Sequence, residues 1–246
     1  MQKKPLILAL LAGLCLSGAA QAALIDRGGG LIYDDVLNIT WLQDANYAQT
    51  SVYDTDGRMN WANANAWAAG LSYGGFDDWR LPTVGPVNGT SFNYGYSNDG
   101  STDVGWNITS PQSEMAYMYY VNLGLKGYSN PDGTVRSDWG IFGNGTAGGQ
   151  NNVDLIYNLQ SFLYWSGTEY ATNPGLAWNN AWYFDTLSGT QGGDGDFYEY
   201  YAWAVRAGDV GAAVTPPPPV NGVPEPQTLA LVGLGLLGLA MARRRG

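Results

Sequence analysis

Three aromatic runs in the second half of the chain decide the fold. They read Phe162-Leu163-Tyr164-Trp165-Ser166, Ala181-Trp182-Tyr183-Phe184 and Tyr200-Tyr201-Ala202-Trp203-Ala204-Val205-Arg206. Short aromatic runs separated by Gly-, Asn- and Asp-rich stretches are typical of β-strands. The three runs therefore predict a meander of antiparallel strands that supplies much of an aromatic core.

Upstream of these strands the pattern predicts a hairpin and a helix. Residues 30–34 and 38–42 are short β-prone runs that flank Asp35-Val36-Leu37, the expected turn. In residues 59–71 the apolar side chains recur at helical spacing, which predicts an amphipathic helix. The side chains expected on its buried face are Trp61, Ala64, Ala68 and Leu71.

A second helix and two long loops complete the pattern. Ser110-Pro111 is expected to open this helix, because serine suits the cap and proline the first helical position, and Gly124 is expected to end it. Residues 85–105 and 127–152 are rich in Gly and Asn and predict loops. This order indicates an α+β fold in which an antiparallel sheet carries two helices on one side and long Gly/Asn-rich loops.

The N-terminal segment is predicted to be a secretory signal peptide. Met1-Gln2-Lys3-Lys4 is short and positive, an apolar run follows, and small residues lead up to Ala22. We expect signal peptidase to cleave between Ala22 and Ala23, which makes residues 1–22 the signal peptide and residues 23–214 the globular domain. The only cysteine, Cys15, lies in the removed segment.

The C-terminal segment has a linker followed by three parts. Residues 215–222 include four consecutive prolines and form a stiff linker. The remainder, residues 223–246, comprises Val223-Pro224-Glu225-Pro226, an apolar run and Arg243-Arg244-Arg245. The apolar run has only about 14 residues, whereas roughly 20 span a bilayer comfortably. This length favours transient membrane insertion over the alternative, a permanent single-span anchor that would stay in the mature protein.

Residues 223–246 resemble the PEP-CTERM sorting signal in all three parts: the motif, the short apolar segment and the arginine cluster. The resemblance implies that an exosortase, a membrane transpeptidase, recognises and removes the tail. It also implies an exported protein of the cell envelope, surface or extracellular matrix of a Gram-negative-type bacterium.

Composition restricts the partners and the chemistry of the exported region. Between residues 23 and 222 there are six basic and 20 acidic residues, a formal net charge of −14, which disfavours nucleic acid and anionic lipid as partners. The chain has no histidine, and the exported region has no cysteine. Ser-His-Asp and Cys-His catalysis, histidine-ligated zinc and thiolate sites are therefore excluded, and no residue stands out as catalytic.

The middle of the chain is similar to the Lcl C-terminal-domain family. The similarity lies in D-W-R-L-P-T at residues 78–83, Y-W-S-G-T-E at residues 164–169, and residues 181–184 continuing to 204–206, and it covers roughly residues 30–209. It implies a fold related to C-type lectin-like domains and a role in surface adhesion or glycan contact. It implies no characterised catalytic residue.

Five residues are candidates for ligand binding: Arg80, Glu169, Trp178, Asp185 and Arg206. Arg80 and Arg206 are rare positive charges expected near carboxylates. They form either ion pairs that fix strand ends or a polar pocket that binds ligand hydroxyls or carboxylates. Trp178 opens a Trp-Asn-Asn string that resembles the Trp-Asn-Asp string of calcium-dependent lectins, but it lacks the aspartate.

Calcium is the one cofactor that the residues suggest. Asp194, Asp196 and Glu199 lie close together in the sequence, and calcium takes six to eight oxygen ligands. The alternative is a solvated acidic turn.

Two groups of aromatic residues have different expected roles. The tryptophans of the family strings, Trp79, Trp165, Trp182 and Trp203, are expected in the core. Loop aromatics are the candidates for sugar platforms, because binding residues concentrate on loops. These are Phe92, Tyr94, Tyr96, Trp106 and Trp139.

The leading functional hypothesis is a non-catalytic, lectin-like surface or matrix protein that contacts exopolysaccharide or another envelope protein. One alternative is a glycan-cleaving enzyme that uses two carboxylates. Another is a structural coat component that needs no soluble ligand.

Overall fold

The computed structural model describes residues 24–170 and 180–211. The chain divides into a unit of residues Met1–Ala212 and a unit of residues Ala213–Gly246, and all the described residues belong to the first. Trp178, the predicted signal cleavage site and the predicted sorting signal lie outside the described residues. Within the described ranges, no helix is long and apolar enough to cross a membrane.

The predicted hairpin is confirmed and belongs to a four-stranded sheet. Strands β2 (Leu31–Asp34) and β3 (Ile39–Leu42) pair antiparallel, and β1 (Leu24–Gly28) and β13 (Val205–Ala207) extend the sheet in the order β1-β2-β3-β13. A two-pronged ion pair between Arg27 on β1 and Asp209, just after β13, joins the two outer strands. The first and last strands of the domain are therefore held together by a side-chain contact as well.

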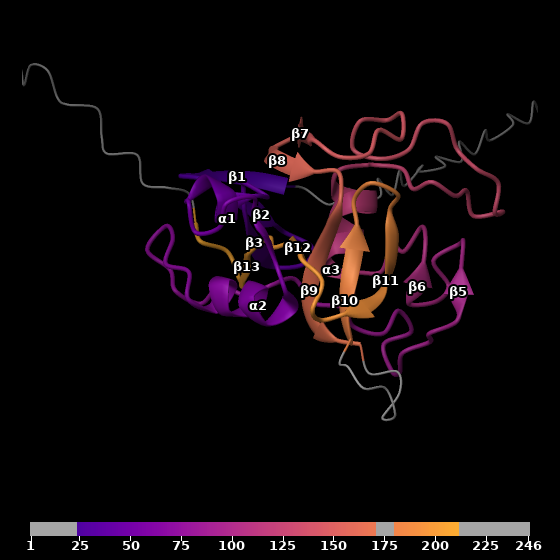
Figure 1. Cartoon of the computed structure of the whole chain (residues 1–246), viewed down its shortest axis with the longest axis horizontal. Coiled ribbons are helices and arrows are strands. Elements are labelled where there is room, and N and C mark those ends of the chain that lie inside the picture. The colour runs from indigo at the N-terminus through magenta and orange to yellow at the C-terminus, as the bar shows by residue number, and fades with distance from the viewer. Residues whose placement is uncertain (1–23, 171–179, 212–246) are drawn as a thin grey trace, which may run out of the picture. The chain divides into compact units, whose positions relative to one another are not determined.

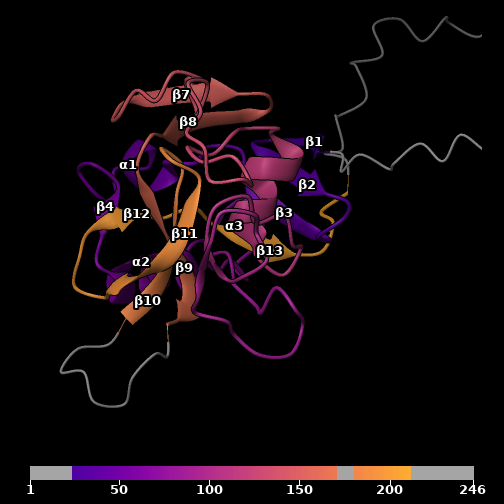
Figure 2. The same ribbon diagram turned by 90° about the vertical axis from the view of Figure 1, so that its right-hand side faces the viewer.

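A seven-stranded sheet forms the centre of Figure 1. Its strands run in the order β4-β12-β9-β10-β11-β6-β5, and β12–β9 and β5–β6 are parallel pairs within otherwise antiparallel pairing. Their bounds are β4 Arg58–Met59, β12 Tyr200–Tyr201, β9 Leu163–Glu169, β10 Asn180–Asp185, β11 Thr190–Gly195, β6 Val104–Gly105 and β5 Tyr96–Ser97. A separate hairpin of β7 (Gln150–Val153) and β8 (Ile156–Gln160) lies at the top of Figures 1 and 2.

The predicted α+β class with mainly antiparallel strands is confirmed, but the prediction of one sheet is wrong because the strands form separate sheets. Residues 200–206 explain the division between the two larger ones. Their first two residues form β12 in the seven-stranded sheet, whereas Val205 begins β13 in the four-stranded sheet. The chain passes from one sheet to the other through Ala202-Trp203-Ala204, where the Ala204 carbonyl accepts a hydrogen bond from the Leu42 amide. Both sheets thus share one continuous aromatic segment.

The first predicted helix is present but shorter, and its buried face differs. Helix α2 (Trp61–Ala69) begins after Asn60, whose side chain accepts a hydrogen bond from the Asn63 amide and caps the helix. Trp67 is buried rather than Trp61, which is partly exposed. A short helix, α1 (Tyr47–Thr50), precedes it, and both lie on the left of Figure 1.

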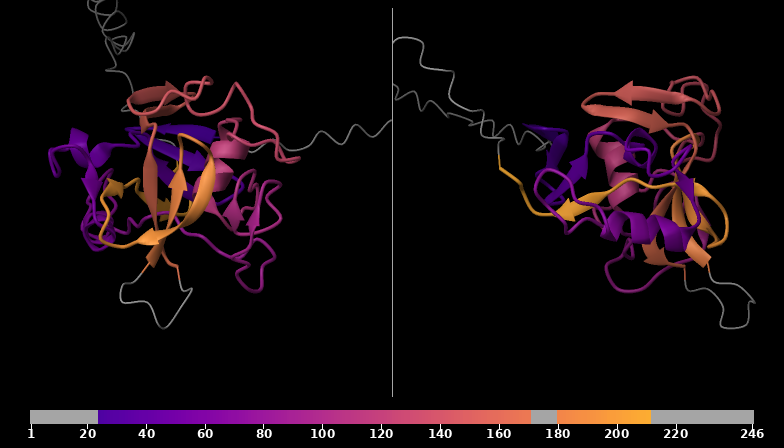
Figure 3. Two further views of the ribbon diagram at one scale, coloured as in Figure 1. Left: turned by 45° about the vertical axis from the view of Figure 1, so that its right-hand side comes forward. Right: turned by 60° about the vertical axis from the view of Figure 1, so that its left-hand side comes forward.

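The second predicted helix begins three residues later than expected. Ser110 makes a turn, because its hydroxyl accepts a hydrogen bond from the Gln112 amide and its carbonyl accepts one from the Ser113 amide. Helix α3 (Glu114–Tyr117) follows and continues as a π-helix, η1 (Met118–Asn122). Both views in Figure 3 show this helical segment beside the strands of the central sheet. The ring of Tyr119 on η1 lies 5.2 Å from that of Phe184 on β10.

Trp203 connects the two larger sheets through the core. Its ring is 1% exposed and lies 4.6 Å from the ring of Trp41 on β3 and 6.3 Å from that of Tyr164 on β9. Its indole Nε1 donates a hydrogen bond of 2.7 Å to the Leu42 carbonyl. The expectation that the tryptophans of the family strings form core is confirmed, since Trp79, Trp165 and Trp182 are also buried.

Trp203→Phe is expected to lower the free energy of unfolding by about 3 kcal/mol, because it removes a buried hydrogen bond and leaves a cavity between the sheets. Urea unfolding followed by far-ultraviolet circular dichroism measures this. Trp61→Phe is the matched control: Trp61 also donates to a carbonyl, that of Ser166, but is partly exposed. A loss no larger than the control's would contradict the role of Trp203.

Asp34 at the hairpin turn is fully buried. Its carboxylate accepts hydrogen bonds from the Val36 and Leu37 amides and from Asn122 Nδ2 at 2.5 Å. Burial is the main cause that raises its pKa. The other amide atom of Asn122, Oδ1, is buried without a hydrogen-bond partner in the described part of the chain.

Asp34→Asn is expected to raise the free energy of unfolding at neutral pH. A carboxyl whose pKa is raised by folding contributes stability while it is protonated, and this contribution is lost as pH rises through the folded-state pKa. The asparagine stays neutral and can donate to Asn122 Oδ1 after the Asn122 amide rotates. Urea unfolding of both proteins from pH 4 to pH 8 should show a gain that grows with pH; a gain that shrinks as pH rises would contradict the argument.

Candidate functional site

The two strings that carry the family resemblance are bonded to each other. The Pro82 carbonyl accepts hydrogen bonds from the Ser166 hydroxyl and the Gly167 amide, both 2.8 Å long. The Val84 amide, just beyond the first string, donates to Thr168 Oγ1. These contacts join residues 78–84 to strand β9. The two strings therefore have a structural role in the domain.

Arg80 extends this contact to helix α3. Its two terminal nitrogens donate to the two carboxylate oxygens of Glu114 at 2.7 and 2.8 Å, and the Thr83 amide donates to the same carboxylate. The backbone of Arg80 also pairs with Val205 on β13. Helix α3, strand β9 and strand β13 are therefore all fixed to the segment around Arg80.

The remaining predicted ligand-binding residues are not gathered into one pocket. Arg206 makes a two-pronged ion pair with Asp78, and its guanidinium lies 4.0 Å from the centre of the Phe76 ring. Asp185 is partly buried at the β10–β11 turn, where it accepts hydrogen bonds from Leu187 and Ser188. Burial raises its pKa.

Glu169 is exposed at the far end of β9 from Asp185. Strand β10 pairs its Asp185 with Leu163 and its Ala181 with Glu169, so the two carboxylates lie at opposite ends of the strand pair. Along β10, four residue steps separate Ala181 from Asp185, roughly 13 Å. Arg80 and Arg206 were expected to form either ion pairs that fix strand ends or a polar ligand pocket, and the structure shows ion pairs. The partner of Arg80, Glu114, was not among the carboxylates expected from the sequence.

The three acidic candidates for calcium do not come together. No group of three or more acidic side chains in the described ranges is placed to hold a metal ion. Asp194 accepts a hydrogen bond from the Tyr200 hydroxyl at 2.7 Å, and the Asp196 carbonyl accepts one from the Trp61 amide. Their positions favour an acidic turn, and calcium binding itself stays a prediction.

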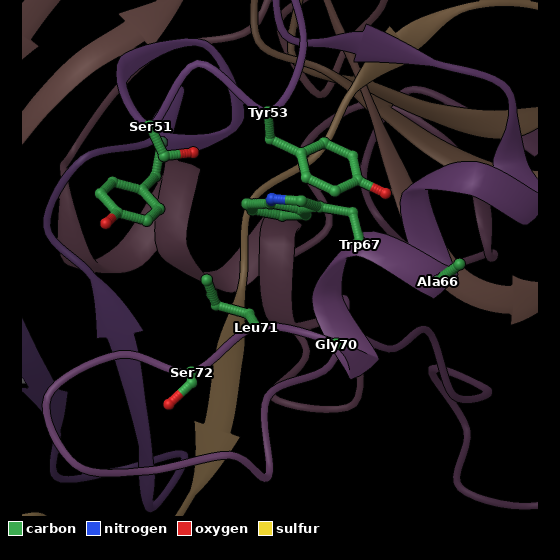
Figure 4. A pocket seen from close by; sticks show the side chains of 8 residues that line it. Ser51, Tyr53, Ala66, Trp67, Gly70, Leu71 and Ser72 are labelled. Atoms are coloured by element: carbon green, nitrogen blue, oxygen red, sulfur yellow. The ribbon is translucent and has the colours of Figure 1, made fainter.

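An open hollow lies between helices α1 and α2 (Figure 4). It has a volume of about 420 Å³ and is lined by Tyr47, Ser51, Tyr53, Ala66, Trp67, Gly70, Leu71 and Ser72. Trp67 is 3% exposed and forms the floor, whereas Tyr53 is 60% exposed, and Figure 4 shows the two rings beside each other. None of the lining residues is ionisable at neutral pH, so the hollow is neutral and aromatic.

The loop that presents Tyr53 has a fixed backbone. After α1 the chain turns back, and the Tyr53 and Asp54 amides both donate to the Ala48 carbonyl. Asp54 then accepts hydrogen bonds from the amides of Asp56 and Gly57. Val52 has a φ of 61°, a conformation that β-branched residues rarely adopt, and it is 85% exposed. The loop thus keeps two apolar side chains at the surface beside the hollow.

The hollow can hold a small, mostly neutral ring with hydroxyl groups. Ligand pockets are typically concave and apolar, with a few polar groups that fix orientation. Here the aromatic rings offer apolar faces, and Ser51 and Ser72 offer hydroxyls at the margin. The apolar face of a sugar ring packs on aromatic rings in this way while its hydroxyls reach polar groups.

Sequence reasoning did not identify this site. The available signal was Val52-Tyr53, an apolar pair inside an otherwise polar turn between Thr50 and Gly57. Of the predicted loop platforms, Tyr96 is 55% exposed, and Phe92 and Tyr94 instead pack on the buried ring of Trp182 at 5.2 and 6.0 Å.

Comparison with known families places the protein among exported, envelope-associated proteins. Residues 222–245 match the PEP-CTERM protein-sorting motif, which implies an exported, envelope-associated protein of a Gram-negative-type bacterium that is processed by an exosortase. Residues 30–206 match the Lcl C-terminal domain, and the chain belongs to that family. No curated protein and no solved structure gave a significant match.

Glu114→Gln is expected to lower the free energy of unfolding by about 2 kcal/mol, because it breaks a largely buried ion pair that also holds a backbone amide. The Arg80 side chain is 36% exposed, so water limits the loss. Thermal and urea unfolding measure it. Asp138→Asn is the control, since its pair with Lys126 is 51% exposed on both sides and should contribute little. Equal effects of the two substitutions would contradict the structural role of Glu114.

Proposed function

We propose that this domain is a non-catalytic, lectin-like surface or matrix module that contacts exopolysaccharide through the hollow of Tyr47, Tyr53 and Trp67. The observation that carries the proposal is a neutral aromatic hollow bordered by the exposed side chain of Tyr53. Family membership and the sorting motif support a role at the cell surface or in the matrix.

The ligand that suits this hollow is a neutral sugar. The lining residues carry no charge, and the exported region has an excess of acidic residues that repels anionic polymers. Aromatic rings bind the apolar face of a sugar regardless of charge. The fixed loop around Val52 favours binding, because a pre-ordered ring loses little conformational freedom when it meets its ligand.

Tyr53→Ala is expected to weaken binding of neutral polysaccharide by about fivefold, since an aromatic contact contributes on the order of 1 kcal/mol. The exported chain is tested on the producing strain's exopolysaccharide and on a panel of neutral glycans, with calcium and then with a chelator.

Tyr157→Ala is the matched control, because Tyr157 is a 46% exposed tyrosine on strand β8. The proposal fails if Tyr53→Ala and the control bind alike, or if the unsubstituted chain binds no glycan. Loss of binding in the presence of the chelator would support the prediction that the domain binds calcium. New reducing ends after incubation would point to the alternative of a glycan-cleaving enzyme.

A further inference from the structure

Arg136 differs from every other basic residue of the domain. Residues 24–211 contain six basic side chains, and five of them form ion pairs. Arg136 makes no ion pair and no side-chain hydrogen bond within the described residues, although the chain has many acidic groups. The charge of Arg136 reaches the two carboxylates nearest in sequence, but stronger contacts hold both of them: Asp132 accepts from Thr134, and Asp138 pairs with Lys126.

A row of four aromatic rings includes Tyr128, the residue that lies opposite Arg136 in the pairing of their two backbone segments. The Arg136 amide donates to the Tyr128 carbonyl at 2.9 Å, which places the two residues on adjacent backbone segments. The Tyr128 ring lies 5.8 Å from that of Trp106 and 5.2 Å from that of Trp139. Tyr96 continues the row with its ring 5.3 Å from Trp106 and is 55% exposed. We call Tyr96, Trp106, Tyr128 and Trp139 the aromatic row.

Two hydrogen-bond donors beside Tyr128 have no partner. The Nε of Arg136 and the indole Nε1 of Trp106 are both buried without an acceptor among the described groups. Buried donors in proteins are nearly always paired, and the exceptions call for an explanation such as a bound molecule.

The other arginines indicate which acceptor fits. Each of Arg27, Arg58, Arg80 and Arg206 holds a carboxylate with two nitrogens. The planar guanidinium matches the two oxygens of a carboxylate, which makes such contacts strong and directional. We propose that Arg136 and the aromatic row form a second binding site, for a sugar that carries a carboxylate.

The charge of the domain restricts the polymer that contains this sugar. With 20 acidic and six basic residues between residues 23 and 222, the domain repels a chain that is charged at every sugar. The ligand is therefore a glycan in which sugars with a carboxylate are spaced among neutral ones. This inference shares with the proposed function the premise of glycan contact. It concerns a different surface, because β4, which precedes α2, and β5, which carries Tyr96, are the opposite edges of the seven-stranded sheet. Figure 1 shows α2 on the left and β5 on the right.

The test compares methyl β-glucuronide with methyl β-glucoside, which share a ring and differ in the carboxylate. Binding to the exported chain is measured by calorimetry and by tryptophan fluorescence. We expect the glucuronide to bind about tenfold more tightly, and Arg136→Gln to remove that difference. Arg136→Lys should retain only part of it, because an ammonium keeps the charge without the planar fork.

Two controls separate this site from the hollow and from misfolding. Arg58→Gln removes an ion-paired arginine whose side chain is 40% exposed and should leave glucuronide binding unchanged. Tyr53→Ala should also leave it unchanged, whereas it weakens binding of neutral glycan. Near-ultraviolet circular dichroism and thermal unfolding confirm that Arg136→Gln is folded.

The proposal is overturned if the glucuronide binds no better than the glucoside, or if Arg136→Gln binds both as the unsubstituted chain does. Loss of glucuronide binding in Tyr53→Ala alone would assign the acidic sugar to the hollow and also overturn it. Failure of neutral glycan to respond to Tyr53→Ala would defeat the proposed function and leave the Arg136 result standing.

Discussion

The fold depends on the contact between residues 80–84 and strand β9. The Pro82 carbonyl receives two hydrogen bonds from β9, and on the same segment Arg80 holds the Glu114 carboxylate and pairs its backbone with Val205. Strand β9 belongs to the seven-stranded sheet and Val205 to the four-stranded sheet. One short segment without long strands of its own thereby links both sheets and helix α3. The two strings that carry the resemblance to the family meet at this segment.

The parts of the fold that depend on neighbouring residues could be predicted from the sequence. The hairpin of β2 and β3 follows from a turn between two β-prone runs, and the tryptophans of the family strings are core as expected. The start of α3 could not be predicted, because the partner that fixes Glu114 is Arg80, 34 residues away. The division of residues 200–206 between two sheets depends on the pairing of Val205 with β3, which no local pattern encodes.

The candidate site was harder to predict, for a physical reason. The hollow forms because residues after α1 turn back onto the Ala48 carbonyl and place Tyr53 beside Trp67, which comes from a different helix. Sequence reasoning selected charged residues instead, and Arg80 and Arg206 proved to be paired within the domain. Scarce charges in an acidic chain are mostly engaged by the abundant opposite charge. The arginine that suggests a binding site is therefore Arg136, because it forms no ion pair with a carboxylate among the described residues.

The ion pair between Arg27 and Asp209 has a mechanical consequence. It fastens the first strand of the domain to the chain just beyond the last strand, with two contacts of 2.9 and 2.5 Å. Tension applied through the chain that follows Gly211 would reach this pair before it reached β13. Load would then be shared between β1 and β13, the two outer strands of the four-stranded sheet, instead of peeling β13 away alone. A domain pulled from its C-terminal end would resist unfolding better with its first and last strands joined in this way.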